Sequence, residues 1–265
     1  MLSVLIQYCN DPRPERMAEY DECVRRNLAN PHVKAVHNLV EPGVVVPPEF
    51  VRHPRYVETR IERWLTYRAA FEYANAALPG EIVALLNLDI FLDPDGDWPR
   101  AEAMLRGSNT VFCLGRTEFG ADGETYKDPA FASLAFANTQ DAWVFKTPIA
   151  VANCDFEIGT LGCDNAIADR LMRAGYVPVN ALNHFKIFHY DRVREKTART
   201  TTATHVTERG PHHSRHPERD GQYLVPDYDA FQSVDKVLEL LKVPELGRYA
   251  VICDVFTKFI KINNP

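Results

Sequence analysis

The stretch IVALLNLDIFLD, residues 82–93, decides the fold of this chain. Its first five residues form a continuous apolar run, which is typical of a parallel strand buried on both faces. The polar residues Asn87, Asp89 and Asp93 follow at once. Side chains at the end of a buried parallel strand point into the crevice where such sheets bind ligands. The stretch therefore predicts an α/β protein with a site at this strand end, although Asp89 could equally cap the loop after the strand.

Apolar runs and helical patterns alternate along the rest of the chain, which is typical of successive βα units. The further strands are expected at residues 2–8, 33–40, 111–114, 142–145, 176–179 and 186–190. Helices are expected at residues 13–28, 59–78 and 165–174. Thr59 is expected to cap the second of these helices, because a threonine hydroxyl can accept from the first free backbone N–H groups.

The length and net charge of the chain limit the classes of function that it can have. A chain of 265 residues with 46% hydrophobic residues fits one elaborated α/β domain. Its formal net charge of -6 argues against nucleic acid as a partner. No run of 18 or more apolar residues is present, so no transmembrane segment is expected. The opening residues suit a buried strand and lack the basic region of a signal peptide, so we expect a cytoplasmic protein.

Two further residues could carry chemistry. Asp164 stands at the beginning of a predicted helix, where it can either cap the helix or act as a general base in the crevice. His189 lies in an apolar segment late in the chain, where it is either a core residue or a metal ligand. Each residue gains a function only if the fold brings it to the end of the strand at 82–86.

Together these motifs resemble the GT-A-fold glycosyltransferases, and in particular inverting, family-2-like members. Asn87-Leu88-Asp89 matches the metal-binding DxD motif of that family, and residues 3–8 resemble its first strand. Gly162-Cys163-Asp164, followed by RLMRAGY at residues 170–176, matches its acidic motif and the helix after it. Two positions depart from the pattern: Asn87 replaces the first acid of the DxD motif, and Cys163 replaces the first acid of the Glu-Asp pair.

The resemblance implies a GT-A-like, Rossmann-type mixed sheet flanked by helices, in a single domain over residues 1–196. The nucleotide-binding half would cover about residues 1–95 and the acceptor half about residues 96–196. Residues 197–221, which are polar, are expected to form a flexible loop over the donor. Residues 222–265 would form a C-terminal extension with a helix and a strand.

The resemblance also implies a role for each site residue. A divalent metal, Mn²⁺ or Mg²⁺, would be held by Asp89, His189 and Asn87, and Asp164 would be the catalytic base. The donor would be a nucleoside diphosphate sugar, bound by Gln7, Tyr8, Glu41, Arg60, Arg68 and Asn87. The acceptor would be a glycan or another hydroxyl compound, bound by Asp141 and Trp143.

Two other classes of function remain open on the sequence. One is a non-catalytic module that binds a sugar or a nucleotide. The other is a metal-dependent phosphohydrolase or nucleotidyltransferase that uses the same acidic crevice. The turn after the first strand, residues 9–13, has no glycine, which argues against a nucleotidyltransferase because such enzymes usually cradle phosphate in a Gly-rich loop.

Overall fold

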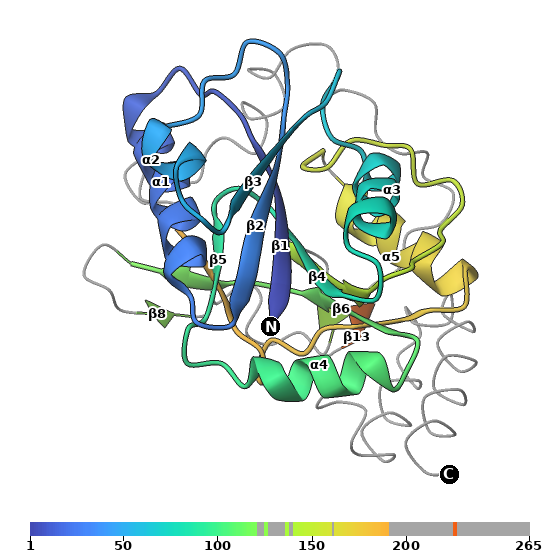
Figure 1. Ribbon diagram of the computed structural model, residues 1–265. Helices are drawn as coiled ribbons and strands as arrows, with labels where there is room; N and C mark the ends of the chain where they lie inside the picture. The colour runs from blue at the N-terminus through green and yellow to red at the C-terminus, as the bar shows by residue number, and fades with distance from the viewer. Residues whose placement is uncertain (121–124, 127–135, 138–139, 161, 191–224, 227–265) are drawn as a thin grey trace.

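A seven-stranded sheet is the centre of the structure, a computed structural model that describes residues 1–120, 125–126, 136–137, 140–160, 162–190 and 225–226 (Figure 1). Its strands are β1 (Leu2–Tyr8), β2 (Val33–Val40), β3 (Tyr56–Arg60), β4 (Ile82–Leu86), β6 (Thr110–Leu114), β10 (Ala142–Lys146) and β11 (Val177–Val179). They lie in the order β11-β6-β10-β4-β1-β2-β3. Only β10 runs antiparallel to its neighbours among these strands, so the sheet is mixed.

Helices cover both faces of this sheet. The helices are α1 (Pro14–Ala29), α2 (Pro48–Val51), α3 (Tyr67–Ala77), α4 (Trp98–Arg106) and α5 (Cys163–Arg173). Figure 1 shows α1 on one side of the sheet and α3 and α5 on the other. The side chains of β4 alternate between the two cores: Ile82 and Leu86 join the core beneath α1 and α4, whereas Val83 and Leu85 join the core beneath α3 and α5. This double covering explains why the whole apolar run is buried.

A smaller sheet lies beside the first. It consists of β5 (Ile90–Leu92), β12 (Ile187–His189), β7 (Thr117–Phe119) and β8 (Thr125–Tyr126), in the order β5-β12-β7-β8. A separate pair is formed by β9 (Phe136–Ala137) and β13 (Val225–Pro226). Residues 87–89 thus connect the central strand of the large sheet to the first strand of the small one.

Side-chain amides at the end of α1 and directly after it hold β5 in place. Asn27 Nδ2 donates to the carbonyl of Ile90 over 2.9 Å, and Asn27 Oδ1 accepts from the backbone N–H of Leu92 over 3.1 Å. Asn30 Nδ2 donates to the carbonyl of Leu92 over 3.0 Å. The guanidinium of Arg26 lies 4.8 Å from the ring centre of Phe91. These contacts fix the small sheet relative to α1, and therefore relative to the turn at residues 87–89.

The prediction of a mixed α/β sheet flanked by helices is confirmed, but the helix expected at residues 59–78 is wrong in its first part. Residues 56–60 form β3, which pairs in parallel with β2, and the helix begins only at Tyr67. Its cap is Thr66, whose side chain accepts from the backbone N–H of Ala69, and not Thr59. Residues 56–60 are extended and not helical because β2 offers them an open strand edge to pair with, and because Val57 and Thr59 are β-branched.

The helix α4 was not expected from the sequence. No helix among the described residues is both long and apolar enough to cross a bilayer. The loop expected at residues 197–221 lies outside the described residues. So does the extension at residues 222–265, apart from residues 225–226.

Candidate functional site

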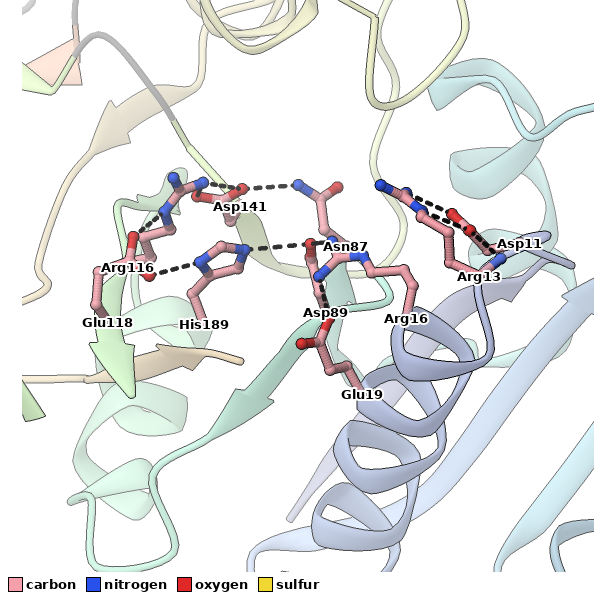
Figure 2. A network of polar contacts seen from close by, with 10 residues as sticks. All are labelled: Asp11, Arg13, Arg16, Glu19, Asn87, Asp89, Arg116, Glu118, Asp141 and His189. Carbon is pink, nitrogen blue, oxygen red and sulfur yellow. Dashed lines mark hydrogen bonds and ion pairs between the residues drawn. The ribbon is translucent and has the colours of Figure 1, made fainter. Parts of the chain in front are cut away.

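The candidate site lies where the strands β1, β2, β3, β4 and β6 end and β10 begins. In the parallel strands the carboxyl ends share one edge of the sheet, and the antiparallel β10 brings its first residue to the same edge, where Ala142 pairs with Leu86 and Leu114. A series of hydrogen bonds and ion pairs runs along this edge (Figure 2). Its members are Glu19, Arg16, Asp89, His189, Glu118, Arg116, Asp141 and Asn87.

Asp89 and His189 meet at the centre of this network. His189 is the last residue of β12 and pairs in register with Ile90, next to Asp89. His189 Nε2 lies 3.2 Å from Asp89 Oδ2, although the two residues are 100 positions apart. His189 Nδ1 lies 2.7 Å from Glu118 Oε2 on the neighbouring strand β7. The proximity expected of Asp89 and His189 is confirmed, and their role in binding metal stays a prediction.

The imidazole between two carboxylates has a strongly perturbed acidity. Burial opposes the charged form of His189, but the carboxylate of Asp89 outweighs burial and raises its pKa to about 9. Burial would likewise raise the pKa of Asp89, but the charges of His189 and Arg16 hold it well below its usual range. For Glu118, hydrogen bonding and charge from His189 outweigh burial and lower the pKa to about 2. Both carboxylates are therefore ionised at neutral pH.

Arg16 is a member of the site that the sequence did not predict. Its guanidinium donates through Nη2 to Asp89 Oδ2 and through Nη1 to Glu19 Oε2, the latter over 2.8 Å. It also lies 4.8 Å from the ring centre of Tyr20. The side chain is only 3% exposed. A signal was present, because Arg16 and Glu19 stand on the buried stripe of α1 with Tyr20 and Val24, where charged residues are unusual.

Arg116 and Glu118 were also missed. Arg116 Nε donates to Glu118 Oε1 over 2.7 Å, and its Nη1 donates to Asp141 Oδ2 over 3.3 Å. Asp141 accepts at Oδ1 from Asn87 Nδ2 over 2.9 Å. The amide nitrogen of Asn87 is thus directed to Asp141. The role of Asn87 as a metal ligand stays a prediction, and only its amide oxygen could fill it.

The donors present fit a divalent metal that takes its other ligands from a substrate, provided that metal binding displaces the proton which the raised pKa of His189, about 9, keeps on its imidazole at neutral pH. Asp89 Oδ2 and His189 Nε2 are separated by about the distance expected of neighbouring ligands of one ion with bonds of ~2.1 Å. Glu118 bonds the other imidazole nitrogen, as a carboxylate commonly does when it orients a metal-binding histidine. No group of three or more His, Cys, Asp or Glu side chains suited to a metal occurs in the part of the chain that the structure describes. Water and phosphate oxygens would complete such a site, as they commonly do for Mg²⁺.

Asp164 lies at the same edge, next to Gln140 and Asp141. It is in the first turn of α5, but the residue that caps the helix is Gly162, with φ 82°, so the alternative that Asp164 is the helix cap does not hold. Its Oδ2 accepts from the backbone N–H of Gln140 over 3.3 Å, and its Oδ1 lies 3.0 Å from Cys163 Sγ. Burial, followed by the charge of Asp141, raises the pKa of Asp164 to about 7. Burial and the charge of Asp141 therefore outweigh the favourable effect that a helix N-terminus has on a carboxylate.

Of the two residues expected at the acceptor, only Asp141 reaches the site. Trp143 is fully buried in the core beneath α3, with its ring edge-on to Tyr67 at a centroid distance of 4.9 Å. It cannot stack on a sugar, so this prediction is wrong. The cause is the alternation of side chains along β10, which directs position 143 into the core.

The residues expected to bind nucleotide divide into two groups. Gln7, Glu41 and Arg60 gather at the ends of three adjacent strands: Gln7 Nε2 donates to Glu41 Oε2 over 3.1 Å, and Arg60 Nη1 donates to the carbonyl of Glu41 over 3.4 Å. Tyr8 is buried beneath α1 and its hydroxyl bonds Asp21, so the prediction that its side chain meets the nucleotide is wrong. Arg68 is exposed on α3, where its nearest carboxylate is that of Asp155, at 3.8 Å.

Of the two arginines expected to bind the nucleotide, only Arg68 belongs to the helix α3. Arg60 is the last residue of β3 and does not lie on the helix expected at residues 59–78.

Comparisons with known proteins give structural similarity only. No protein-family profile matches the chain, and no curated protein sequence matches it. Among solved structures, GalNAc-T7 with UDP, GalNAc and Mn²⁺ is similar with 10% sequence identity and a TM-score of 0.45, over 71% of this chain and 43% of that one. The mannosyltransferase PcManGT from Pyrobaculum calidifontis, in complex with GDP-Man and Mn²⁺, is similar with 16% identity and a TM-score of 0.49, over 73% of this chain and 57% of that one. The chain thus spans about half the length of these two proteins.

Proposed function

We propose that this chain is a glycosyltransferase that moves a sugar from a nucleoside diphosphate sugar to an acceptor hydroxyl, with a divalent metal and with inversion. One observation carries the proposal. A single sheet edge holds two carboxylates with very different pKa values, that of Asp89 well below its usual range beside His189 and that of Asp164 at about 7. Environments that push two acids apart in this way are typical of active sites that divide charge stabilisation from proton transfer.

Asp89 and His189 are the residues that would hold Mn²⁺ or Mg²⁺. When bound, the metal offsets the negative charge that builds up on the leaving diphosphate. Glu118 orients His189 through the Nδ1 atom, and Arg116 holds Glu118. Gln7, Glu41 and Arg60 lie at the ends of β1, β2 and β3, where the nucleoside would bind.

Asp164 is the general base of the proposal. A carboxylate with a pKa of about 7 is half ionised at neutral pH and is a much stronger base than an ordinary aspartate. In the attack, the acceptor oxygen loses its proton to Asp164 and bonds the anomeric carbon, while the bond from that carbon to the diphosphate oxygen breaks. A single displacement of this kind inverts the anomeric configuration.

The test begins with binding. Thermal unfolding is measured with UDP, GDP and dTDP, each with Mn²⁺ and with EDTA, and the nucleotide that stabilises the protein selects a panel of donor sugars. Release of that nucleoside diphosphate, together with a glycosylated acceptor of inverted configuration, is the expected result.

Other outcomes would assign the chain to a different class of function or a different mechanism. Stabilisation by nucleotide without turnover of any donor would indicate a non-catalytic binding module. Release of inorganic phosphate from the nucleotide itself would indicate a phosphohydrolase. A product that retains the anomeric configuration would refute the single displacement and the role of Asp164.

A further inference from the structure

Arg16 places a permanent positive charge on the atom that the metal would need. A guanidinium stays protonated at any pH a protein tolerates. The Nη2 atom of Arg16 bonds Asp89 Oδ2, and this is the oxygen that faces His189 Nε2. A metal ion at these two donors and the guanidinium therefore compete for one oxygen.

The arginine is not a mobile surface side chain. Its other nitrogen, Nη1, bonds Glu19 over 2.8 Å, and its planar group lies against the ring of Tyr20. Arg16 and Glu19 are both almost completely buried on α1. The site is thus built so that a cation already satisfies Asp89.

We infer that Arg16 keeps the affinity of Asp89 and His189 for a free metal ion low, so that the metal binds together with the diphosphate and not before it. This inference rests on the proposed function. Two protein donors are few for a divalent cation, and a positive charge close to them lowers the affinity further. A diphosphate supplies additional oxygen ligands, and its negative charge offsets that of Arg16. The arginine is thus a positioning residue that couples metal binding to donor binding.

The test measures Mn²⁺ binding directly, by electron paramagnetic resonance and by calorimetry, without any acceptor or turnover. The wild type is expected to bind Mn²⁺ weakly alone and much more tightly with the diphosphate that stabilises it. In R16Q the Kd for Mn²⁺ alone should fall by roughly tenfold, because one positive charge close to the ion is removed. The ratio of the Kd without diphosphate to the Kd with diphosphate should shrink accordingly. R16K, which keeps the charge, should stay close to the wild type.

A second variant distinguishes loss of the bond to Asp89 from misfolding of the protein. R16Q leaves Glu19 as a buried carboxylate without the guanidinium that it now bonds, which could unfold the helix. The double variant R16Q/E19Q removes that cost and keeps the net charge of the pair, so tighter Mn²⁺ binding there would show that the bond to Asp89 itself is responsible. Circular dichroism and thermal unfolding confirm that each variant is folded.

The possible outcomes distinguish a failure of this inference from a failure of the proposed metal site. Equal Mn²⁺ affinity in the wild type, R16Q and R16Q/E19Q, with binding lost in D89N, would overturn the role of Arg16 and leave the metal site standing. Tighter binding in R16Q and R16Q/E19Q, again lost when D89N is added, supports the inference. No Mn²⁺ binding by any variant, with or without UDP, GDP or dTDP, would overturn the metal site and the inference together.

Discussion

The turn after β4 and the first turn of α5 each present an aspartate to the same edge of the sheet, and the two aspartates differ sharply. Burial alone would raise the pKa of both. Asp89 has two cationic partners, His189 and Arg16, and its pKa falls well below the usual range. Asp164 has a thiol and a backbone N–H as partners and a second acid, Asp141, nearby, and its pKa rises to about 7.

This difference shows that the neighbouring groups, and not the residue type, determine the pKa of each aspartate at this edge. A carboxylate that is always ionised suits a metal or another cation, whereas one that gains and loses a proton near pH 7 suits proton transfer. Each substitution below changes one of these two aspartates or a group close to it.

The largest effect is expected from Asp89→Asn. The change removes the ionised ligand and leaves His189 and Arg16 facing a neutral amide, so sugar transfer should fall by roughly 10,000-fold, which corresponds to the several kcal/mol that a metal supplies. Stabilisation by nucleotide should also lose its dependence on Mn²⁺ in thermal unfolding. Asp93→Asn is the matched control, because Asp93 lies outside the network and should remain close to wild type. Unchanged binding of metal and nucleotide in Asp89→Asn would contradict the assignment.

Asp164→Asn is expected to reduce transfer by about 1,000-fold, within the range typical of a positioned general base. Donor and metal binding should persist, since Asn87, Asp89 and His189 are untouched. The measurement is kcat for transfer, with a separate binding titration. Transfer at nearly the wild-type rate would exclude Asp164 as the base and make Asp141 the next candidate.

The same variant has an effect on stability that activity does not report. The pKa of Asp164 is raised from 3.8 to about 7 in the folded protein, so the folded state loses stability as the pH rises through that window. Asp164→Asn removes this loss. Its melting temperature should therefore exceed that of the wild type at pH 8, and the difference should vanish toward pH 4.

A smaller effect is expected from Asp141→Asn on the pH profile. The charge of Asp141 helps to raise the pKa of Asp164, so its removal should lower that pKa. The acidic limb of kcat/KM, expected near pH 7 in the wild type, should then move to lower pH by about one pH unit. An unmoved limb would mean that the titrating group is not Asp164 or that Asp141 does not influence it.

The smallest effect on activity is expected from Asn87→Asp, which restores the acid of the DxD pattern. The amide nitrogen of Asn87 donates to Asp141 over 2.9 Å, so an acid at position 87 would place two carboxylates within hydrogen-bonding distance. We expect a loss of activity of only a few-fold, at a cost of about 1 kcal/mol, and a melting temperature that falls more at pH 8 than at pH 5, where the pair can share a proton. Tighter Mn²⁺ binding without a loss of stability would show instead that position 87 faces the metal.

Much of the fold was predictable because its signals are local. The strands β1, β2, β4 and β10 and the helices α1 and α5 were expected within a few residues of their bounds, since apolar runs and helical spacing reveal them directly. The boundary between β3 and α3 was not predictable in this way, because residues 56–60 become a strand only by pairing with β2. The helix α4 had a signal that was overlooked: Asp97 caps it and Pro99 stands in its first turn.

The site was predictable only in part, for a similar reason. Asp89, Asp164 and His189 could be named from motifs, whereas Arg16, Arg116 and Glu118 enter through ion pairs between distant elements. The bond between Arg16 and Asp89 spans 73 positions, and no spacing in the sequence indicates it. Trp143 was placed at the acceptor only through the resemblance to the family, and its position on β10 directs its side chain into the core.

The amides of Asn27 and Asn30 have a consequence for the behaviour of the protein in a crowded solution. As the first strand of the small sheet, β5 would otherwise offer its outward N–H and carbonyl groups to any extended segment. Asn27 takes up the carbonyl of Ile90 and the N–H of Leu92 much as a neighbouring strand would, and Asn30 takes up the carbonyl of Leu92. A strand from another chain therefore finds these backbone groups of β5 already hydrogen-bonded. In this way α1 protects this side of the protein from edge-to-edge aggregation.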